Sequence, residues 1–420
     1  WEQTHLEKRR SVTMDYSELI AAADPSIFTN SISAWISGIS INSVIMLIMM
    51  IFMLVGAIDK IRGNKLGYGE KFEDGFNAMG GLAMSMAGVV AAAPVLSMLL
   101  GPILKPIYGI FGASPAMFST TLLACDMGGY PLAMQLAGDD IAIGNFAGLI
   151  LGTMMGPTIV FTIPVALGII KKEDRGYLGA GVLAGMITIP IGCIVGGLMM
   201  NTLAPEYHLS IITIIQNLIP VIIIAALIVI GLWFAPGPMI KGFNVFGAGV
   251  TIVITALTAI AVFEQITGIM FPVFHIMVEN PADGSRGLDS GLLVCGQIAI
   301  VLIGAFPMVE WITRTFGKAL EKIGAALGMN EQGSAGMVAN LANNIAMFNI
   351  MGEMNPKGKL LNVAFSVSAA FVFGDHLGFT AGNNADMIFP VIVGKLVAGV
   401  TAIIVANILA PKLLSKIENV

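Results

Sequence analysis

The chain of 420 residues is 56% hydrophobic and 11% charged, with a formal net charge of −5. Soluble domains carry about 25% charged residues, and a single soluble core stops growing near about 250–300 residues. The composition therefore excludes a soluble globular domain and predicts a polytopic membrane protein of the all-α class. The mild charge is spread over short loops and gives no indication of a nucleic-acid partner.

The N-terminal part of the chain, 1–38, differs from the rest. The stretch "WEQTHLEKRRSVTMDYSELIAAADP" is polar, and it lacks the order of basic region, apolar core and cleavage site that is typical of a signal peptide. We interpret residues 1–38 as a polar N-terminal extension. A processed start, an artificial addition and a short helix lying on the membrane are all compatible with it.

Apolar runs follow one another along the remaining chain, and most reach the roughly 20 residues that a spanning helix needs. Two of them are interrupted near their middles by Gly, Asn, Asp or Ser, and these are 115–138 and 333–350. The runs lie at 40–58, 78–101, 115–138, 141–170, 177–204, 210–236, 245–268, 290–313, 333–350, 360–384 and 387–411.

Basic residues indicate whether the two interrupted runs cross, because Lys and Arg concentrate in short cytoplasmic loops. If both runs enter and leave on the same side, every basic loop falls on one face, and the acidic loop 275–290 falls on the other. We therefore predict two re-entrant hairpins, at 115–138 and 333–350, and nine spanning helices. The basic positions are the loops 59–76, 171–175, 314–332 and 357–359, together with Lys241, Lys412 and Lys416.

Each half of the chain then reads as helix, helix, hairpin, helix, helix. Residues 39–209 form repeat 1, residues 245–420 form repeat 2, and a linker helix and loop at 210–244 join them. Four crossings and a linker turn the second half upside down, which gives the inverted structural repeats common in secondary transporters. At one constant spacing along the chain, Leu123-Ala124 matches Leu341-Ala342, Gly156 matches Gly374, and Phe161-Thr162 matches Phe379-Thr380.

Charged and polar residues lie at the interruptions. Asp126 is in the first hairpin, Asn344 is at the equivalent place in the second, and Asp375 follows Gly374, the counterpart of Gly156. Broken backbone at membrane depth survives only where it is buried in protein or lines a wet cavity. A carboxylate at the bilayer centre costs about 2.5–3.5 kcal/mol, so a small cation would supply the missing charge. The pattern predicts a midplane site for a small polar amine, reached by alternating access.

We expect Asp126 to bind the ammonium group of such a solute, with Asp375 as the alternative counter-charge. Asp126 could instead cap a hairpin helix by accepting backbone N–H bonds. Asp375 and His376 could pair with each other or with Lys395, which is the one mid-helix lysine.

A hydroxyl group of the solute would be oriented by Asn343 and Asn344, with Thr158 and His376 at the opposite wall. The two asparagines could instead form a turn that satisfies its own backbone. Three aromatic residues could present a ring face to an ammonium, and these are Phe161, Phe379 and Tyr130.

The cysteines suggest neither a disulfide framework nor a zinc site, because Cys125, Cys193 and Cys295 all lie in apolar segments. No metal-ligand spacing such as H-E-x-x-H and no nucleophile elbow occurs in the sequence. We therefore expect no cofactor, no metal and no catalytic residues.

Long stretches resemble the ethanolamine permease of the ethanolamine-utilisation pathway, the EutH family. The resemblance runs from about Ile41 to Pro411, and none of the site residues proposed above is taken from it. The stretches that carry it are "KFEDGFNAMG" (71–80), "TLLACDMGG" (121–129), "GLILGTMMGPTIVFTIPVALGII" (148–170), "LAGMITIPIGCIVGGL" (183–198), "AGMVANLANNIAMF" (335–348), "SVSAAFVFGDHLGF" (366–379) and "MIFPVIVGKLVAGVTAI" (387–403).

The resemblance implies a multi-pass protein of the bacterial inner membrane that admits ethanolamine for catabolism. Three other functions stay open on the sequence: a carrier of another small polar solute such as a nucleoside or an amino acid, a passive channel, and an intramembrane enzyme. Coupling to protons or sodium and the oligomeric state, which could be a homo-oligomer, are not indicated by any motif.

Overall fold

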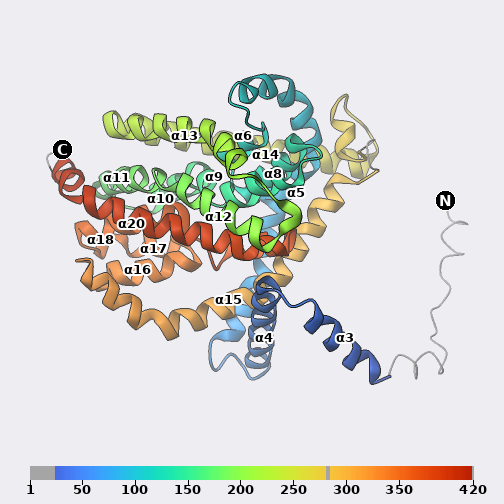
Figure 1. Ribbon diagram of the computed structural model, residues 1–420, viewed down its shortest axis with the longest axis horizontal. Coiled ribbons are helices and arrows are strands. Elements are labelled where there is room, and N and C mark those ends of the chain that lie inside the picture. The colour runs from blue at the N-terminus through green and yellow to red at the C-terminus, as the bar shows by residue number, and fades with distance from the viewer. Residues whose placement is uncertain (1–23, 281–283, 419–420) are drawn as a thin grey trace, which may run out of the picture. The chain divides into compact units, whose positions relative to one another are not determined.

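The structure, a computed structural model, describes residues 24–280 and 284–418 (Figure 1). Within these residues all regular elements are helical, which confirms the predicted all-α class. The α-helices are α3 (Ser26–Ser37), α4 (Ile41–Ile61), α5 (Tyr68–Gly109), α6 (Ala116–Leu122), α7 (Gly129–Ala137), α8 (Ile141–Asn145), α9 (Met155–Pro157), α10 (Ile163–Ile169), α11 (Arg175–Met186), α12 (Ile189–Leu203), α13 (Ile211–Phe234), α14 (Pro236–Thr267), α15 (Gly287–Ala326), α16 (Glu331–Ala342), α17 (Asn344–Ile350), α18 (Pro356–Ala369), α19 (Asp375–Asn383) and α20 (Ile388–Glu418).

The residues before Ile45 form a compact unit separate from the rest of the chain. Of the extension predicted at 1–38, residues 1–23 lie outside the described residues. The described part is mainly the helix α3, which has no buried residue and carries exposed apolar side chains, among them Phe28 and Trp35. An exposed apolar helix of this kind is typical of a segment that lies on a lipid surface.

Seven helical segments in the described residues are long and apolar enough to cross a bilayer, and the bent pair α11 and α12 raises the number to eight. A helix rises 1.5 Å per residue, so about 20 residues span the hydrocarbon core. The sequence predicts nine crossings. The ninth, residues 356–383, falls short because it is broken into α18 and α19, which have 14 and 9 residues.

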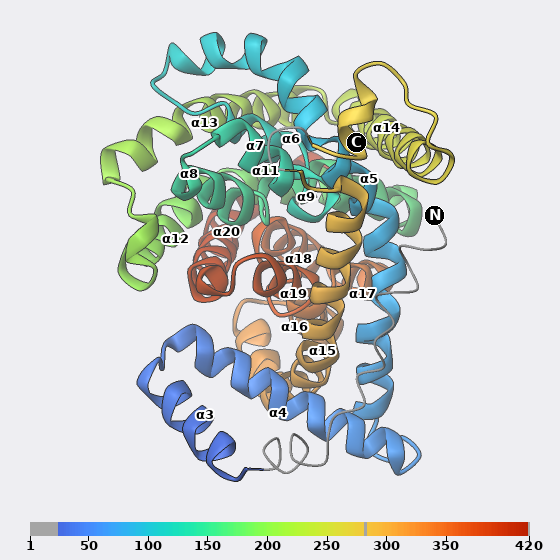
Figure 2. The ribbon, with the colours of Figure 1, turned by 90° about the vertical axis from the view of Figure 1, so that its right-hand side faces the viewer.

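The two longest helices, α5 and α15, lie side by side (Figure 2). Their contact is made through small residues. A Cβ atom on Gly75 would lie 2.6 Å from the carbonyl oxygen of Leu302, and one on Gly291 would lie 2.8 Å from Cα of Ala87. Glycine at these positions lets the two backbones approach, which is how helices commonly associate in lipid.

The first predicted hairpin consists of α6, a 3₁₀ turn at Cys125–Met127, and α7. Ser114 at its start and Gly138 at its end line the same cavity, so the segment leaves the protein interior near where it enters. The turn depends on Gly128, which has φ +88° and on which a Cβ atom would lie 2.0 Å from Cγ1 of Val89. Residues 115–138 therefore form a helical hairpin, and its re-entrant path in a membrane stays a prediction.

The second predicted hairpin consists of α16 and α17, which meet at the extended residue Asn343. Its two ends are hydrogen-bonded to each other. The backbone N–H of Asn355 donates to Oδ1 of Asn330 at 3.1 Å, and Nδ2 of Asn330 donates to the carbonyl of Glu353 at 2.8 Å. Nδ2 of Asn355 also donates to the carbonyl of Gly328 at 2.9 Å. The predicted hairpin 333–350 thus begins and ends at one place.

Each hairpin tip is hydrogen-bonded to the break in the span that follows it. The backbone N–H of Cys125 donates to the carbonyl of Gly152 at 2.9 Å. In the second half, the N–H groups of Phe371 and Phe373 donate to the carbonyls of Asn340 and Leu341 at 3.1 and 3.0 Å. These bonds satisfy backbone groups that the broken helices leave free, which membrane depth requires.

A close approach of a span to a hairpin occurs at both Gly156 and Gly374, two positions that the predicted repeat pairs. A Cβ atom on Gly156 would lie 1.9 Å from the carbonyl oxygen of Leu123, and one on Gly374 would lie 2.2 Å from that of Ala342. Both glycines therefore let a broken span cross the hairpin beside it. The inverted relation of the halves, and their division at 39–209, 210–244 and 245–420, stay predictions.

Candidate functional site

A buried lysine marks the point where the two broken spans meet. Lys395, on α20, is only 1% exposed. Its Nζ atom donates to the backbone carbonyl of Thr153 at 2.6 Å and lies 3.0 Å from Nδ1 of His376. Thr153 belongs to the break in the span 141–169, and His376 directly follows the break at 370–374. One ammonium group therefore bridges both interruptions.

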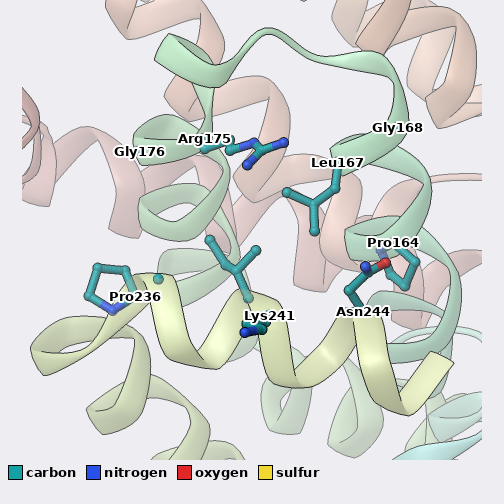
Figure 3. Close-up of a pocket in the computed structure, with 10 residues that line it drawn as sticks. Pro164, Leu167, Gly168, Arg175, Gly176, Pro236, Lys241 and Asn244 are labelled. Carbon is teal, nitrogen blue, oxygen red and sulfur yellow. The ribbon is translucent and has the colours of Figure 1, made fainter. Parts of the chain in front are cut away.

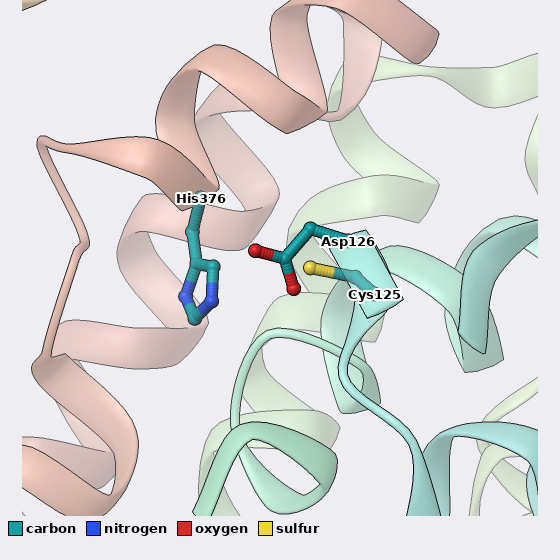
Figure 4. A group of neighbouring side chains, drawn as sticks. All are labelled: Cys125, Asp126 and His376. Atoms are coloured by element: carbon teal, nitrogen blue, oxygen red, sulfur yellow. The ribbon is translucent and has the colours of Figure 1, made fainter. Parts of the chain in front are cut away.

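An acid and a thiol from the first hairpin face this lysine-histidine pair. One side-chain ligand atom each of Cys125, Asp126 and His376 lies within 4.8 Å of the others. The Asp126 carboxylate points toward the His376 ring, and the Cys125 thiol lies beside it (Figure 4). Asp126 is half-buried, whereas Cys125 and His376 are buried. The hairpin tip thus presents its acid to the second broken span, as the sequence predicts.

The donor set of Cys125, Asp126 and His376 could hold a metal ion by distance. Nδ1 of the same histidine already contacts Nζ of Lys395 at 3.0 Å, which leaves only Nε2 of that ring as a ligand for a metal ion. The arrangement is therefore better suited to hydrogen bonding and charge pairing than to metal coordination.

A second acid lies at the start of α19. Asp375 is half-buried and directly precedes His376 in the chain. A carboxylate oxygen of Asp126 lies within 4.8 Å of a ring nitrogen of His376, and Nζ of Lys395 lies 3.0 Å from Nδ1 of that ring. A carboxylate in the first turn of a helix is favoured by the helix dipole. The two predicted counter-charges, Asp126 and Asp375, are thus brought to one locality, each from a different half of the chain.

Two aromatic pairs flank the charged residues. The ring of Tyr130 meets that of Phe379 edge to face at 5.8 Å, and the rings of Phe161 and Phe371 meet in the same way at 5.8 Å. Phe371 also contacts the His376 ring, at 5.1 Å between centroids. Along the second broken span, Phe371 precedes the charged pair 375–376 and Phe379 follows it. Each aromatic pair joins a residue of the first half to one of the second.

The predicted hydroxyl-binding residues have partners within the protein. Oγ1 of Thr158 lies 3.0 Å from the carbonyl of Met154 and 3.1 Å from that of Val367, so its hydroxyl hydrogen is already used. Oδ1 of Asn343 accepts from the N–H of Ile345 at 2.7 Å and caps α17. This is the structural alternative considered for the two asparagines. Substrate contact by Thr158 and Asn343 stays a prediction.

Asn344 differs from these two residues. It is fully buried, and its Nδ2 atom donates to Oγ1 of Thr162 at 2.9 Å. Its Oδ1 atom is buried and accepts no hydrogen bond from any described residue. A buried acceptor without a donor costs about 1–3 kcal/mol. The amide oxygen of Asn344 is therefore a group that an incoming hydroxyl or ammonium could satisfy, and its role in binding stays a prediction.

A pairing of His376 with Lys395 is the structural alternative considered for that histidine, and the structure contains this contact, at 3.0 Å between Nζ and Nδ1. The contribution of the Thr153 carbonyl to the cluster could not be predicted, because every residue has a backbone carbonyl. The sequence predicts that Cys125 is a small buried residue, and the structure confirms its burial.

Two cavities among the described residues are lined by neither Asp126 nor Asp375. One of about 570 Å³ is lined by parts of α10, α11 and α14 and includes Arg175 and Lys241 (Figure 3). Its basic side chains disfavour a cationic ligand. A smaller cavity of about 240 Å³ is lined by Tyr130 and Asn383, together with Asn280 and Ser290 from the region predicted to lie outside. Tyr130, which lines this second cavity, is the residue whose ring meets that of Phe379.

Comparison with known proteins gives a consistent result. The sequence model of the EutH family, described as "Ethanolamine utilisation protein, EutH", matches residues 41–409. A "Probable ethanolamine permease EutH" from Listeria monocytogenes is 55% identical over 377 residues, covering 90% of this chain and 96% of that protein. Proteins of the same name from Escherichia coli and Salmonella typhimurium are 50% and 49% identical, covering 89% of this chain and 96% of each of theirs. No solved structure matches.

Proposed function

Because the chain belongs to the EutH family of ethanolamine utilisation proteins, we propose that it is a permease that carries protonated ethanolamine across the bacterial plasma membrane. One observation carries the proposal furthest. The half-buried carboxylate of Asp126 lies within 4.8 Å of a ring nitrogen of His376, and Nζ of the buried Lys395 lies 3.0 Å from Nδ1 of that ring, where a hairpin tip meets two broken spans. Secondary transporters bind small solutes at such interruptions.

The size of ethanolamine decides how it must be recognised. It has four non-hydrogen atoms, so burial of its two methylene groups contributes only about 0.8 kcal/mol each. An unpaired ammonium group in a dry site costs several kcal/mol. Affinity must therefore come from paired charge and hydrogen bonds. Asp126 binds the ammonium with Asp375 nearby, and the free amide oxygen of Asn344 is the acceptor for the hydroxyl.

The aromatic pairs supply closures for alternating access. Tyr130 lines the cavity that includes residues of the region predicted to be outside, so its ring contact with Phe379 is the candidate closure on that side. Phe161–Phe371 lies on the other side of the cluster along the broken spans. Opening one pair while the other stays closed admits the solute from one side at a time. Because each pair joins the two halves, a movement of one half against the other opens it.

Transport into proteoliposomes tests the proposal. We expect saturable uptake of labelled ethanolamine with counterflow, which a passive channel does not show. Asp126→Asn should reduce uptake below detection, because it removes the charge that pairs with the ammonium. Asp139→Asn is the matched control, since Asp139 is an exposed acid that follows the same hairpin. Normal uptake by the Asp126→Asn protein would remove Asp126 from the site.

Other functions predict different outcomes in the same assay. A carrier of a nucleoside or an amino acid would transport that solute and be blocked by it in a competition panel. An intramembrane enzyme would turn over a lipid or peptide without transport. Growth on low ethanolamine should depend on the protein most strongly in acid, because neutral ethanolamine crosses lipid unaided while its cation does not. Dependence at neutral pH and high ethanolamine alone would contradict the proposal.

A further inference from the structure

The cavity of about 570 Å³ lies where three of the candidate spans end. Its walls are the last turns of α10, the first turn of α11 and the first turns of α14 (Figure 3). The ends of spanning helices lie at the boundary between hydrocarbon and water. Residues 171–175 and Lys241 are among the basic positions predicted to face the cytoplasm. The cavity is therefore at the depth of the lipid head groups, on the predicted cytoplasmic side.

Positive charge enters this cavity from two helices. Arg175 comes from α11 and Lys241 from α14, with the amide of Asn244 one turn farther along α14 (Figure 3). Both basic side chains are exposed, and neither has an ion pair or a hydrogen bond with a described residue. None of the described residues that line the cavity is acidic. Asp174, which directly precedes Arg175, is buried and pairs with Lys359 instead. The cavity is therefore suited to an anionic group.

The rest of the wall is apolar, and it continues into an apolar helix surface. Pro164, Leu167 and Ile240 line the cavity beside the basic residues. Farther along α14, Val245 and Ile252 are 64% and 68% exposed. A small soluble anion gains nothing from such a surface, whereas an acyl chain is stabilised against it. The surroundings of the cavity therefore favour an anion that carries hydrocarbon.

An adjoining cavity gives separate evidence for the membrane boundary. It has a volume of about 370 Å³ and shares Gly176 and Pro236 with the first. Here Nζ of Lys416, near the end of α20, lies 4.5 Å from the centroid of the Trp233 ring, near the end of α13. Tryptophan and snorkelling lysine are typical of the membrane–water interface. Basic pockets between membrane helices on the cytoplasmic side commonly bind anionic lipid head groups.

We infer that the cavity between α10, α11 and α14 binds the phosphate group of an anionic phospholipid. The Arg175 guanidinium and the Lys241 ammonium contact the phosphate, and the acyl chains lie along α14. A guanidinium group matches the geometry of phosphate oxygens, and its hydrogen bonds to them are charge-assisted. A soluble phosphate ester has the same head-group chemistry but lacks the chains. The site is distinct from the one proposed for ethanolamine, because its charge repels a cation.

Lipid binding to the purified full chain tests this inference, and it does not depend on transport. Native mass spectrometry counts the bound lipids, and the thermal midpoint is measured against increasing phosphatidylglycerol or phosphatidylcholine. We expect phosphatidylglycerol to bind at least about tenfold more tightly, because phosphatidylcholine has no net charge. Arg175→Gln combined with Lys241→Gln should remove this preference. Lys318→Gln combined with Lys322→Gln is the matched control, since it removes two exposed lysines that do not line the cavity, and the preference should stay.

A second variant tests the cavity without changing its charge. Gly168 lines it, and a Cβ atom there meets no described atom of another segment within 4 Å. Gly168→Phe therefore adds a ring to the open space while Arg175 and Lys241 stay in place. We expect it to weaken phosphatidylglycerol binding at least about tenfold, because the head group and the ring compete for one volume. Arg175→Lys keeps the charge and should keep the preference for phosphatidylglycerol.

Three results would overturn the inference. The first is equal binding of the two lipids by the unaltered protein. The second is an unchanged preference in both the charge-removing double variant and Gly168→Phe, or its loss in the lysine control as well. The third concerns the source of the phosphate: glycerol 1-phosphate, the head group without acyl chains, should bind at least about 100-fold more weakly than the lipid. Equally tight binding of glycerol 1-phosphate would make this a site for a soluble phosphate ester.

Discussion

Two regions of the molecule share one backbone feature and differ in chemistry. At Gly156 and Gly374, which the predicted repeat pairs, a broken span passes directly over a carbonyl oxygen of the hairpin beside it. The side chains at other equivalent positions are unlike: Asp126 corresponds to Asn344, and Thr158 to His376. The close crossing of a span over a hairpin occurs in both regions. The side chains at the paired positions differ, so the two regions contribute different chemical groups.

The two breaks are also made by different means. In the first half, π-helical turns at 146–151 and 158–162 flank the break, and Pro157 removes a backbone donor. In the second half, Phe371 adopts φ +62°, a conformation that a bulky residue rarely takes. Such strain persists only where the surroundings impose it, and it is common at functional sites. Here the Phe371 N–H bond to Asn340 and its ring contacts with Phe161 and His376 impose it.

The largest effect is expected where the halves are alike. Gly156→Ala and Gly374→Ala place a methyl group 1.9 and 2.2 Å from a backbone oxygen, so the span or the hairpin must move. We expect each to lower the yield of monodisperse protein severely and to abolish uptake, as changes costing more than about 4 kcal/mol do. Gly242→Ala, where a Cβ atom meets no described atom within 4 Å, is the control. Size-exclusion profiles and thermal midpoints measure the outcome, and normal folding of both variants would show that the crossing is not required.

The next effect is expected where the halves differ. The double change Asp126→Asn with Asn344→Asp moves the acid to the equivalent place in the other hairpin. We expect no recovery of ethanolamine uptake, a loss of at least about 100-fold, because Asn344 is fully buried with its amide hydrogen-bonded to Thr162, so that a carboxylate there would lack water or a cation to stabilise it. Labelled uptake by this variant, compared with Asp126→Asn alone, is the measurement. Recovery would mean that the halves are chemically interchangeable and that the asymmetry described here is incidental.

The same comparison shows which features of the fold and of the candidate site could be predicted from the sequence. Spanning helices depend on continuous apolar length, so the runs 141–170 and 210–236 agree closely with the observed segments Ile141–Ile169 and Ile211–Phe234. Polar interruptions and basic loops predict the hairpins, whose re-entrant path stays a prediction. The contact of Lys395 with His376 was one of the alternatives that the sequence left open, because it depends on the path of the chain through the break at 370–374. The sequence predicts nine crossings where the structure has seven or eight candidate spans, and the same break at 370–374 accounts for the missing one.

A moderate effect is expected at the base of the second hairpin. Asn330 and Asn355 close it with reciprocal hydrogen bonds, whereas the ends of the first hairpin line a cavity. Asn355→Ala should lower the stability of the protein by about 1–3 kcal/mol, since it leaves partly buried groups unpaired. The KM for ethanolamine should stay the same, because the change is at the base and not at the tip. Thermal unfolding and uptake kinetics test both statements, with the exposed Asn30→Ala as control. A changed KM with unchanged stability would show that the base of the hairpin takes part in transport.

The smallest effect is expected at Thr158, the counterpart of His376. The sequence pattern places Thr158 at the wall of the site, while in the structure its hydroxyl is directed at the carbonyls of Met154 and Val367. Thr158→Val keeps the shape of the side chain and removes this hydrogen bond, so it should cost about 1 kcal/mol of stability and leave the KM for ethanolamine nearly unchanged. Thr380→Val, which removes a similar bond to the carbonyl of His376, is the matched variant in the other half. If Thr158→Val raised the KM tenfold while Thr380→Val did not, the hydroxyl of Thr158 would be a substrate contact, and the first broken span would supply binding groups as well as backbone.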